Sequence, residues 1–311
     1  MAGTEGASVW RLAVGAEAHG ERLDRFLAGP VGSRAQAQRL IAAGRVRLGG
    51  APTAPSRRVE AGQMVEVDDA GAPSIDPGHA GPAHIDVRIA WEDEHLLVVD
   101  KPAGLVVHPA PGHRTHTLAQ ALAGRAAGGA EPARAGIVHR LDRDTSGLLV
   151  VARSDAVHRA LQRALAARHV QRTYLALVEG RPPARNGTID APLGRDRRAR
   201  RLVSVDTDDP REARTHFSLA EALPAHTLLE ISLETGRTHQ IRAHMRAIGH
   251  PVVGDPTYGT AGQLGLERQF LHSTRLRFEH PVTGAGIDVG SPLPSDLTRA
   301  LERARLESAG R

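Results

Sequence analysis

A segment rich in glycine, proline, aspartate and alanine divides this chain into two parts of unequal length. Residues 69–84 show no hydrophobic periodicity, and such a composition is typical of a linker. The chain is long enough for a small module and a larger domain with its own core. We predict a flexible N-terminal tail over residues 1–17, a small module over 18–68 and the larger domain over 85–305.

The overall composition is that of an ordinary globular protein, with 41% hydrophobic and 24% charged residues. The sequence contains no apolar run of membrane-spanning length, no signal-peptide pattern and no cysteine. Without cysteine there is no disulfide, no thiolate nucleophile and no cysteine zinc site. We expect a cytoplasmic monomer that does not associate with membranes.

The basic residues are almost all arginine. Lys101 is the only lysine among the 40 Lys and Arg residues, and the formal net charge is +5. Arginine forks onto phosphates and stacks on bases, so this choice fits a nucleic-acid partner. A GC-rich genome explains the same preference, and composition alone leaves both explanations open.

The N-terminal part has the pattern of two helices followed by strands. Residues 23–27 have apolar side chains at the i, i+3, i+4 spacing of a helix face. A second helix is predicted from a capping box at Ser33 to a glycine C-cap at Gly44. Strands are predicted over residues 46–50 and 64–67.

Five arginines gather around the second helix and the turn that follows it. They are Arg22, Arg34, Arg39, Arg45 and Arg47. A solvated helix face explains such a run equally well. The order helix, helix, glycine, strand nevertheless resembles an S4-type RNA-binding module, and this resemblance implies that these arginines contact RNA.

The larger part has more strands than helices, and the two do not alternate strictly. Strands are predicted near Ile89 and over residues 96–100, 148–152, 173–178 and 228–233, and helices over 117–122, 155–167 and 238–248. This pattern predicts an α+β domain with a mixed, largely antiparallel sheet flanked by helices and loops.

A charged loop lies directly before the apolar strand at residues 148–152. It reads His139-Arg-Leu-Asp-Arg-Asp-Thr-Ser-Gly147, and loops held on a rigid strand often carry catalytic groups. Asp142 and Asp144 are spaced to share acid and base roles. A hairpin turn whose Asp and Thr side chains bond the backbone explains the same residues, so the loop alone leaves both interpretations open.

Four motifs stand out in the sequence: residues 92–109, 136–147, 170–180 and 234–255, followed by Leu271-His272 and His280-Pro281. Together they resemble the RluA-like family of RNA pseudouridine synthases, in its S4-bearing, RluD/RluC-like branch. The resemblance covers nearly the whole chain. It implies that a uridine already in RNA is isomerised: the uracil is detached at N1, turned, and rejoined to the ribose through C5.

The resemblance assigns a role to each of several residues. Asp142 is the reactive carboxylate, which attacks C1′ or abstracts a sugar proton. Arg140 displaces the target base from its stack, and Tyr174 lies against the uracil face. Arg242 lies on one face of its predicted helix and pairs from there with Asp142. Arg172 stands where the family usually has a lysine.

Two features remain less specific. Arg195 and Arg198 belong to the densest basic run, which we expect on an exposed hairpin; contact with RNA phosphates and a solvated loop both fit. The histidines form no His-Glu-x-x-His arrangement, so we expect neither metal nor cofactor.

The wording of the motifs most resembles enzymes acting on large-subunit ribosomal RNA, free or in a pre-ribosomal particle. Transfer RNA is the alternative substrate, because relatives modify it. A catalytically idle RNA-binding or ribosome-assembly factor is the hypothesis from another class. A carbohydrate hydrolase using Asp142 and Asp144 leaves the S4-like module without a role.

Overall fold

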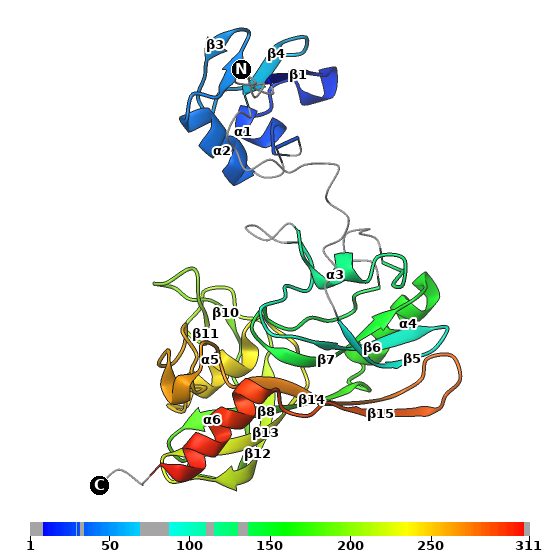
Figure 1. Cartoon of the computed structure of the whole chain (residues 1–311), viewed down its shortest axis with the longest axis vertical. Helices are drawn as coiled ribbons and strands as arrows, with labels where there is room; N and C mark the ends of the chain where they lie inside the picture. Colours follow the sequence, from blue (N-terminus) through cyan, green and yellow to red (C-terminus); the bar gives the residue numbers. More distant parts are fainter. Residues whose placement is uncertain are drawn as a thin grey trace, which may run out of the picture. The chain divides into compact units, whose positions relative to one another are not determined.

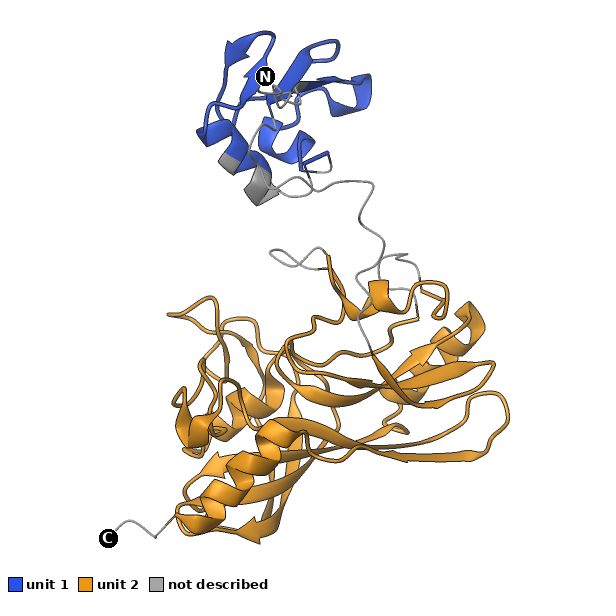
Figure 2. Cartoon of the chain, in the orientation of Figure 1, with its two compact units in different colours: residues 1–83 blue, residues 84–311 orange. Residues whose placement is uncertain are grey.

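The computed structural model describes residues 9–28, 30–31, 34–68, 87–109, 115–129 and 136–307. The chain separates into two compact units, residues 1–83 and residues 84–311 (Figure 2). The predicted linker over residues 69–84 lies outside the described residues, as does the predicted helix cap at Ser33.

The first unit holds a four-stranded antiparallel sheet and two helices (Figure 1). The strands lie in the order β1 (Val9–Ala13), β4 (Met64–Asp68), β2 (Val46–Leu48) and β3 (Ala51–Pro52). Helices α1 (Leu23–Phe26) and α2 (Arg34–Ala42) supply the leucines and isoleucine that pack with β2 and β4 in the core. Gly44, with a φ of +71°, follows α2 as predicted.

The predicted tail over residues 1–17 is wrong for its second half. Residues 9–13 form β1, which pairs antiparallel with residues 64–68 of β4. Val14 is buried in the core of this unit, and a 3-10 helix follows at Ala16–Ala18. β1 satisfies the backbone groups of β4 on the side away from β2. This pairing depends on a partner more than fifty positions away, which local pattern does not show.

The second unit is built on a nine-stranded mixed sheet (Figure 1). The strand order is β5 (Arg88–Glu92), β6 (Leu96–Lys101), β7 (Ser146–Ala152), β14 (Leu271–Glu279), β8 (Gln171–Glu179), β13 (His226–Leu233), β12 (Arg214–Ala222) and β9 (Asn186–Asp190), with β15 (Gly286–Gly290) also paired to β14. Among the described strands, the β7–β14 pair is parallel and the other pairs are antiparallel. The predicted α+β class with a mixed, largely antiparallel sheet is confirmed.

Both faces of this sheet are covered where β6 and β7 run. Leu97 and Leu149 face one core, which includes residues of α3 (Leu118–Ala121), α5 (Gln240–Ala247) and α6 (Ser295–Leu306). Leu96 and Leu148 face a second core, which includes residues of α4 (Asp155–Ala166). Burial on both faces explains why these strands read as continuous apolar runs.

The remaining elements are short. Strands β10 (Gly194–Arg195) and β11 (Val203–Ser204) form a small hairpin, and a 3-10 helix η3 spans Gln263–Gly265. In the part of the chain that the structure describes, no helix combines the length and apolar character needed to cross a membrane.

Candidate active site

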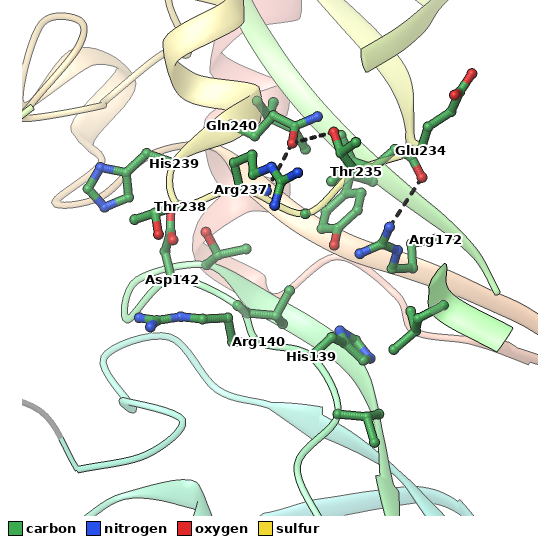
Figure 3. Close-up of a pocket in the computed structure, with 18 of the residues that line it drawn as sticks. His139, Arg140, Asp142, Arg172, Glu234, Thr235, Arg237, Thr238, His239 and Gln240 are labelled. Carbon is green, nitrogen blue, oxygen red and sulfur yellow. Dashed lines mark hydrogen bonds between the residues drawn. The ribbon is translucent and has the colours of Figure 1, made fainter. Parts of the chain in front are cut away.

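A cavity of about 720 Å³ opens in the second unit. Its lining includes the charged loop before β7, the end of α4, the start of β8, and the segment that leads into α5. Figure 3 shows Asp142 and Arg140 on one side and Arg172 on another, with Thr238 and His239 above Asp142. The cavity therefore brings together the predicted residues Asp142, Arg140, Tyr174 and Arg242.

The charged loop is held from below by a buried lysine. Nζ of Lys101 donates to the carbonyl oxygens of Pro102 at 2.9 Å, Leu105 at 2.9 Å and Arg143 at 2.8 Å. Burial lowers the pKa of Lys101 to about 7, although the charge of Asp144 and that of Asp142 oppose this shift. All three N–H donors of the ammonium group are thus used, and they connect the backbone of the loop at Arg143 to the backbone at Pro102 and Leu105.

The end of the loop is held by its contact with β14. Gly147 has a φ of +111°, and a Cβ there would overlap the carbonyl oxygen of Ser273. Only glycine allows this close approach of the two backbones. Nη1 of Arg268 also donates to the carbonyl oxygen of Asp144 at 3.0 Å. The position of the loop therefore depends on contacts with residues more than 120 positions further along the chain.

Arg242 connects the loop to α5. Its Nη1 donates to Oδ2 of Asp142 at 3.2 Å, so the predicted pair forms. Its Nε and Nη2 donate to the two carboxylate oxygens of Asp255 at 2.6 and 2.9 Å. Burial opposes both charges, but the ion pair raises the pKa of Arg242 and lowers the pKa of Asp255. Arg242 therefore remains a cation and presents a fixed donor to Asp142.

Two further partners of Arg242 were not predicted from the sequence. Asp255 is fully buried and is the last residue of the fourth motif, residues 234–255. The ring of Tyr258 lies 5.1 Å from the guanidinium carbon of Arg242, and its hydroxyl lies 3.1 Å from Nδ1 of His239. The available signal was a polar residue at the end of this motif for Asp255, and one three positions beyond it for Tyr258.

The start and end of α5 differ from the prediction. The helix predicted over residues 238–248 spans Gln240–Ala247, and its N-cap is His239, in the left-handed region at a φ of 54°. Oε1 of Gln240 accepts from Thr235 and from the backbone N–H of Arg237, and this stabilises the preceding turn. Ile248, the last residue of the predicted helix, follows the last helical residue and is 36% exposed.

Tyr174 and His139 form part of the wall of the cavity. Burial, together with the charge of Asp142, raises the pKa of Tyr174, while the charge of Arg172 opposes that rise. Nε2 of His139 accepts the backbone N–H of Val150 at 3.1 Å. Burial, and secondly the charge of Arg172, lowers the pKa of His139 to about 3, so its ring is neutral at physiological pH.

Comparison with known proteins identifies the family. The sequence model of RNA pseudouridylate synthase matches residues 95–247, and that of the S4 domain matches residues 21–65. A protein of Chloroflexus aurantiacus named an uncharacterized RNA pseudouridine synthase is 48% identical over 91% of this chain and 90% of its own length. The chain belongs to the RNA pseudouridine synthases. The resemblance to this family and to an S4 module is thereby confirmed.

Other proteins similar to this synthase support its assignment to the family. The ribosomal large subunit pseudouridine synthase D of Pseudomonas aeruginosa is 42% identical over 93% of this chain and 93% of its own length. The structure of human RNA pseudouridylate synthase domain containing 1 matches with a TM-score of 0.54 and 29% identity, over 67% of this chain and 84% of that one.

The arginines predicted to contact RNA lie in two places in the synthase. Arg22 donates to Asp24 at 3.1 Å in the first unit, and Arg47 is exposed on β2. Arg45 precedes β2 and is half-buried, and Arg34 and Arg39 lie in α2 with side chains outside the described residues.

Arg195 and Arg198 are exposed on the β10–β11 hairpin of the second unit, as expected, and do not line the cavity. Within the described ranges, no group of three or more His, Cys, Asp or Glu side chains is placed to hold a metal ion.

Proposed function

We propose that this synthase converts uridine to pseudouridine in large-subunit ribosomal RNA, with Asp142 as the reactive carboxylate. The observation that carries the proposal is the arrangement of Asp142, Arg242 and Asp255 at the cavity. Asp255 orients the guanidinium, and the guanidinium orients one oxygen of Asp142. The other carboxylate oxygen is then available for a sugar placed in the cavity.

The reaction needs few groups besides this carboxylate. Asp142 attacks C1′ or abstracts a sugar proton, and either step breaks the bond between N1 and C1′. The freed uracil turns and C5 bonds to C1′, which either breaks the bond between C1′ and Asp142 or takes back the sugar proton from Asp142. The C5 proton then leaves, and N1 is protonated. Tyr174, in the wall of the cavity, supports the uracil face and receives or relays that proton. Arg140 is exposed beside Asp142 and takes the place of the displaced base in the RNA.

Ribosomal RNA is the substrate that the similar proteins favour, because several of them are named ribosomal large subunit pseudouridine synthase D. The S4 domain and the exposed arginines of the β10–β11 hairpin supply cationic surface for RNA phosphates. A ribosomal RNA substrate also agrees with the cytoplasmic location that we expect from the sequence. Transfer RNA remains the alternative substrate.

Release of tritium from C5 of uridine tests the proposal. Large-subunit RNA carrying 5-tritiated uridine is incubated with the wild-type synthase and with Asp142→Asn. We expect release with the wild type and a loss of about 10³-fold or more with Asp142→Asn, as for other nucleophile or base deletions. Asp144→Asn serves as the comparison within the same loop, and we expect it to retain most of the activity.

The other outcomes separate the alternatives. Release that persists in Asp142→Asn and disappears in Asp144→Asn would contradict the assignment of Asp142. Release from transfer RNA but not from ribosomal RNA would change the substrate and leave the chemistry intact. If no RNA releases tritium but RNA still binds, the chain is an idle RNA-binding factor.

A further inference from the structure

Arg172 is a buried cation in the wall of the cavity. It lies in β8, two positions before Tyr174, and its residue is 7% exposed. Residues two apart in a strand point to the same face, and both of these side chains line the cavity. Figure 3 shows the guanidinium of Arg172 directed toward the interior of the cavity, across from Asp142.

Arg172 differs from the other buried arginines in its partners. Arg242 is paired with two aspartates, and Arg268 is paired with Asp296 at 2.7 Å. No carboxylate among the described residues pairs with Arg172. Its Nη2 donates to the carbonyl oxygen of Leu233 at 3.3 Å, and its Nε is buried without a hydrogen-bond partner in the described part of the chain.

A buried charge without a counter-charge lowers stability. The charge of Arg172 acts on two other residues of the cavity wall. It helps to lower the pKa of His139, and it opposes the rise in the pKa of Tyr174. Nη1 lies against the backbone at Gly236, where an added Cβ would be 2.9 Å away. The guanidinium is therefore confined beside Tyr174 and has unused donors.

We propose that Arg172 stabilises the negative charge that uracil carries while it is detached from the ribose, an inference that rests on the proposed function. When the bond between N1 and C1′ breaks, its electron pair stays with the uracil. C1′ is compensated by a bond to a carboxylate oxygen of Asp142, or by loss of a sugar proton to it. The charge on the uracil spreads over N1, O2 and O4, and an N–H of Arg172 donates to one of these oxygens.

The rotation of the base fits one fixed donor. Turning uracil about the line through N3 and C6 places C5 where N1 had been and exchanges O2 with O4. A guanidinium at a constant position therefore faces a carbonyl oxygen both before and after the turn. Arg172 can stabilise the detached anion throughout without moving, which suits a side chain confined by Gly236 and Leu233.

An RNA phosphate is a less suitable partner for Arg172. Phosphates remain largely solvated, and exposed arginines at the same cavity, Arg140, Arg168 and Arg237, are better placed to meet them. Arg172 is buried beside Tyr174, where the base is expected to lie. The location of Arg172 therefore favours the uracil base over an RNA phosphate as its partner.

A better leaving group tests this role. Fluorine at C5 withdraws electrons and stabilises the uracil anion, so a 5-fluorouridine transcript should depend less on Arg172. Single-turnover consumption of the target nucleoside is followed by chromatography of digested RNA for both transcripts. We expect Arg172→Gln to slow uridine consumption by about 100-fold and 5-fluorouridine consumption by about 10-fold or less, with RNA affinity unchanged. Arg172→Lys, which keeps the charge, should retain much of the rate on uridine.

The controls separate this inference from the proposed function. Arg277→Gln changes an exposed arginine of β14 and should leave both rates unchanged. Asp142→Asn should lose both reactions, and a wild type that consumes neither nucleoside would overturn the proposed function itself. With an active wild type, equal slowing of both transcripts by Arg172→Gln, or weaker RNA binding that accounts for the slowing, would overturn the role of Arg172. Should Arg172→Gln fail to fold, Arg172→Lys provides the same comparison, with a smaller difference expected.

Discussion

Arg242 donates a hydrogen bond to Asp142 over 3.2 Å, although the two residues are 100 positions apart in the chain. The same guanidinium is held by two bonds to Asp255, which is fully buried. The direction of the bond to Asp142 thus depends on a second carboxylate, which does not line the cavity. Under the proposed function, Asp255 is a positioning residue for Asp142.

Asp255→Asn should lower both stability and activity. The substitution leaves Arg242 buried with a single charged partner, and we expect the free energy of unfolding to fall by about 2–4 kcal/mol. The rate of tritium release should fall as well, because the donor to Asp142 is less well oriented. Urea unfolding and tritium release measure the two effects. Asp288→Asn is the matched control, since its exposed pairs with Arg275 and Arg277 should contribute far less.

Asp255 also predicts a dependence on acid. Its pKa is lowered in the folded state, so it binds a proton more readily when unfolded. Its contribution to stability is present above the unfolded pKa of about 4 and is lost as pH falls toward the folded pKa. Asp255→Asn should therefore show a shallower loss of stability below pH 4 than the wild type. Identical acid slopes in the two proteins would contradict this.

Lys101 should titrate near neutral pH and make stability rise in mild alkali. Its folded pKa is about 7, against an ordinary value of 10.5, so between these values the unfolded state binds more protons. The free energy of unfolding should therefore gain a contribution that grows as pH rises through this window. Because Lys101 is the only lysine, a protein labelled with 15N-lysine gives one Nζ signal whose titration reports this pKa directly. A midpoint near 10 would show that the ammonium is not destabilised by burial.

Arg172→Met should raise stability while it lowers activity. The substitution removes a buried cation that has no carboxylate partner among the described residues. It also removes one hydrogen bond, of 3.3 Å, to the carbonyl oxygen of Leu233. We expect a gain of about 1 kcal/mol in the free energy of unfolding, measured by urea unfolding. Arg268→Met is the opposite case, because it strands Asp296 and should destabilise. A loss of stability in Arg172→Met would show that this arginine supports the fold.

Arg195→Gln and Arg198→Gln should weaken RNA binding and leave chemistry unchanged. Both side chains are exposed on the β10–β11 hairpin and lie outside the cavity lining. If each neutralises one phosphate, the slope of log affinity against log salt should fall by about 1 per substitution. Binding titrations at several salt concentrations measure this, with Arg277→Gln as the exposed control. An unchanged slope would mean that the hairpin does not contact RNA.

Hydrophobic spacing in the sequence predicted the strands and helices that depend only on neighbouring residues. The apolar run at residues 148–152 is a buried strand, and the spacing at residues 155–167 is a helix that ends one position earlier. β1 was missed because a short segment becomes a strand only when β4 provides its partner. The start of α5 was predicted two positions too early, because residues 238 and 239 follow a turn that the side chain of Gln240 stabilises.

The sequence by itself determined the family, the α+β class and the candidate residues Asp142, Tyr174 and Arg242, because each lies in a short motif of recognisable composition. Apart from the predicted pair of Arg242 and Asp142, only the tertiary structure decided which buried charges are paired. Asp255 holds Arg242, Lys101 holds the loop, and Arg172 has no carboxylate partner among the described residues. These differences arise because the sheet order brings together side chains from distant positions, and burial makes each pairing, or its absence, energetically important.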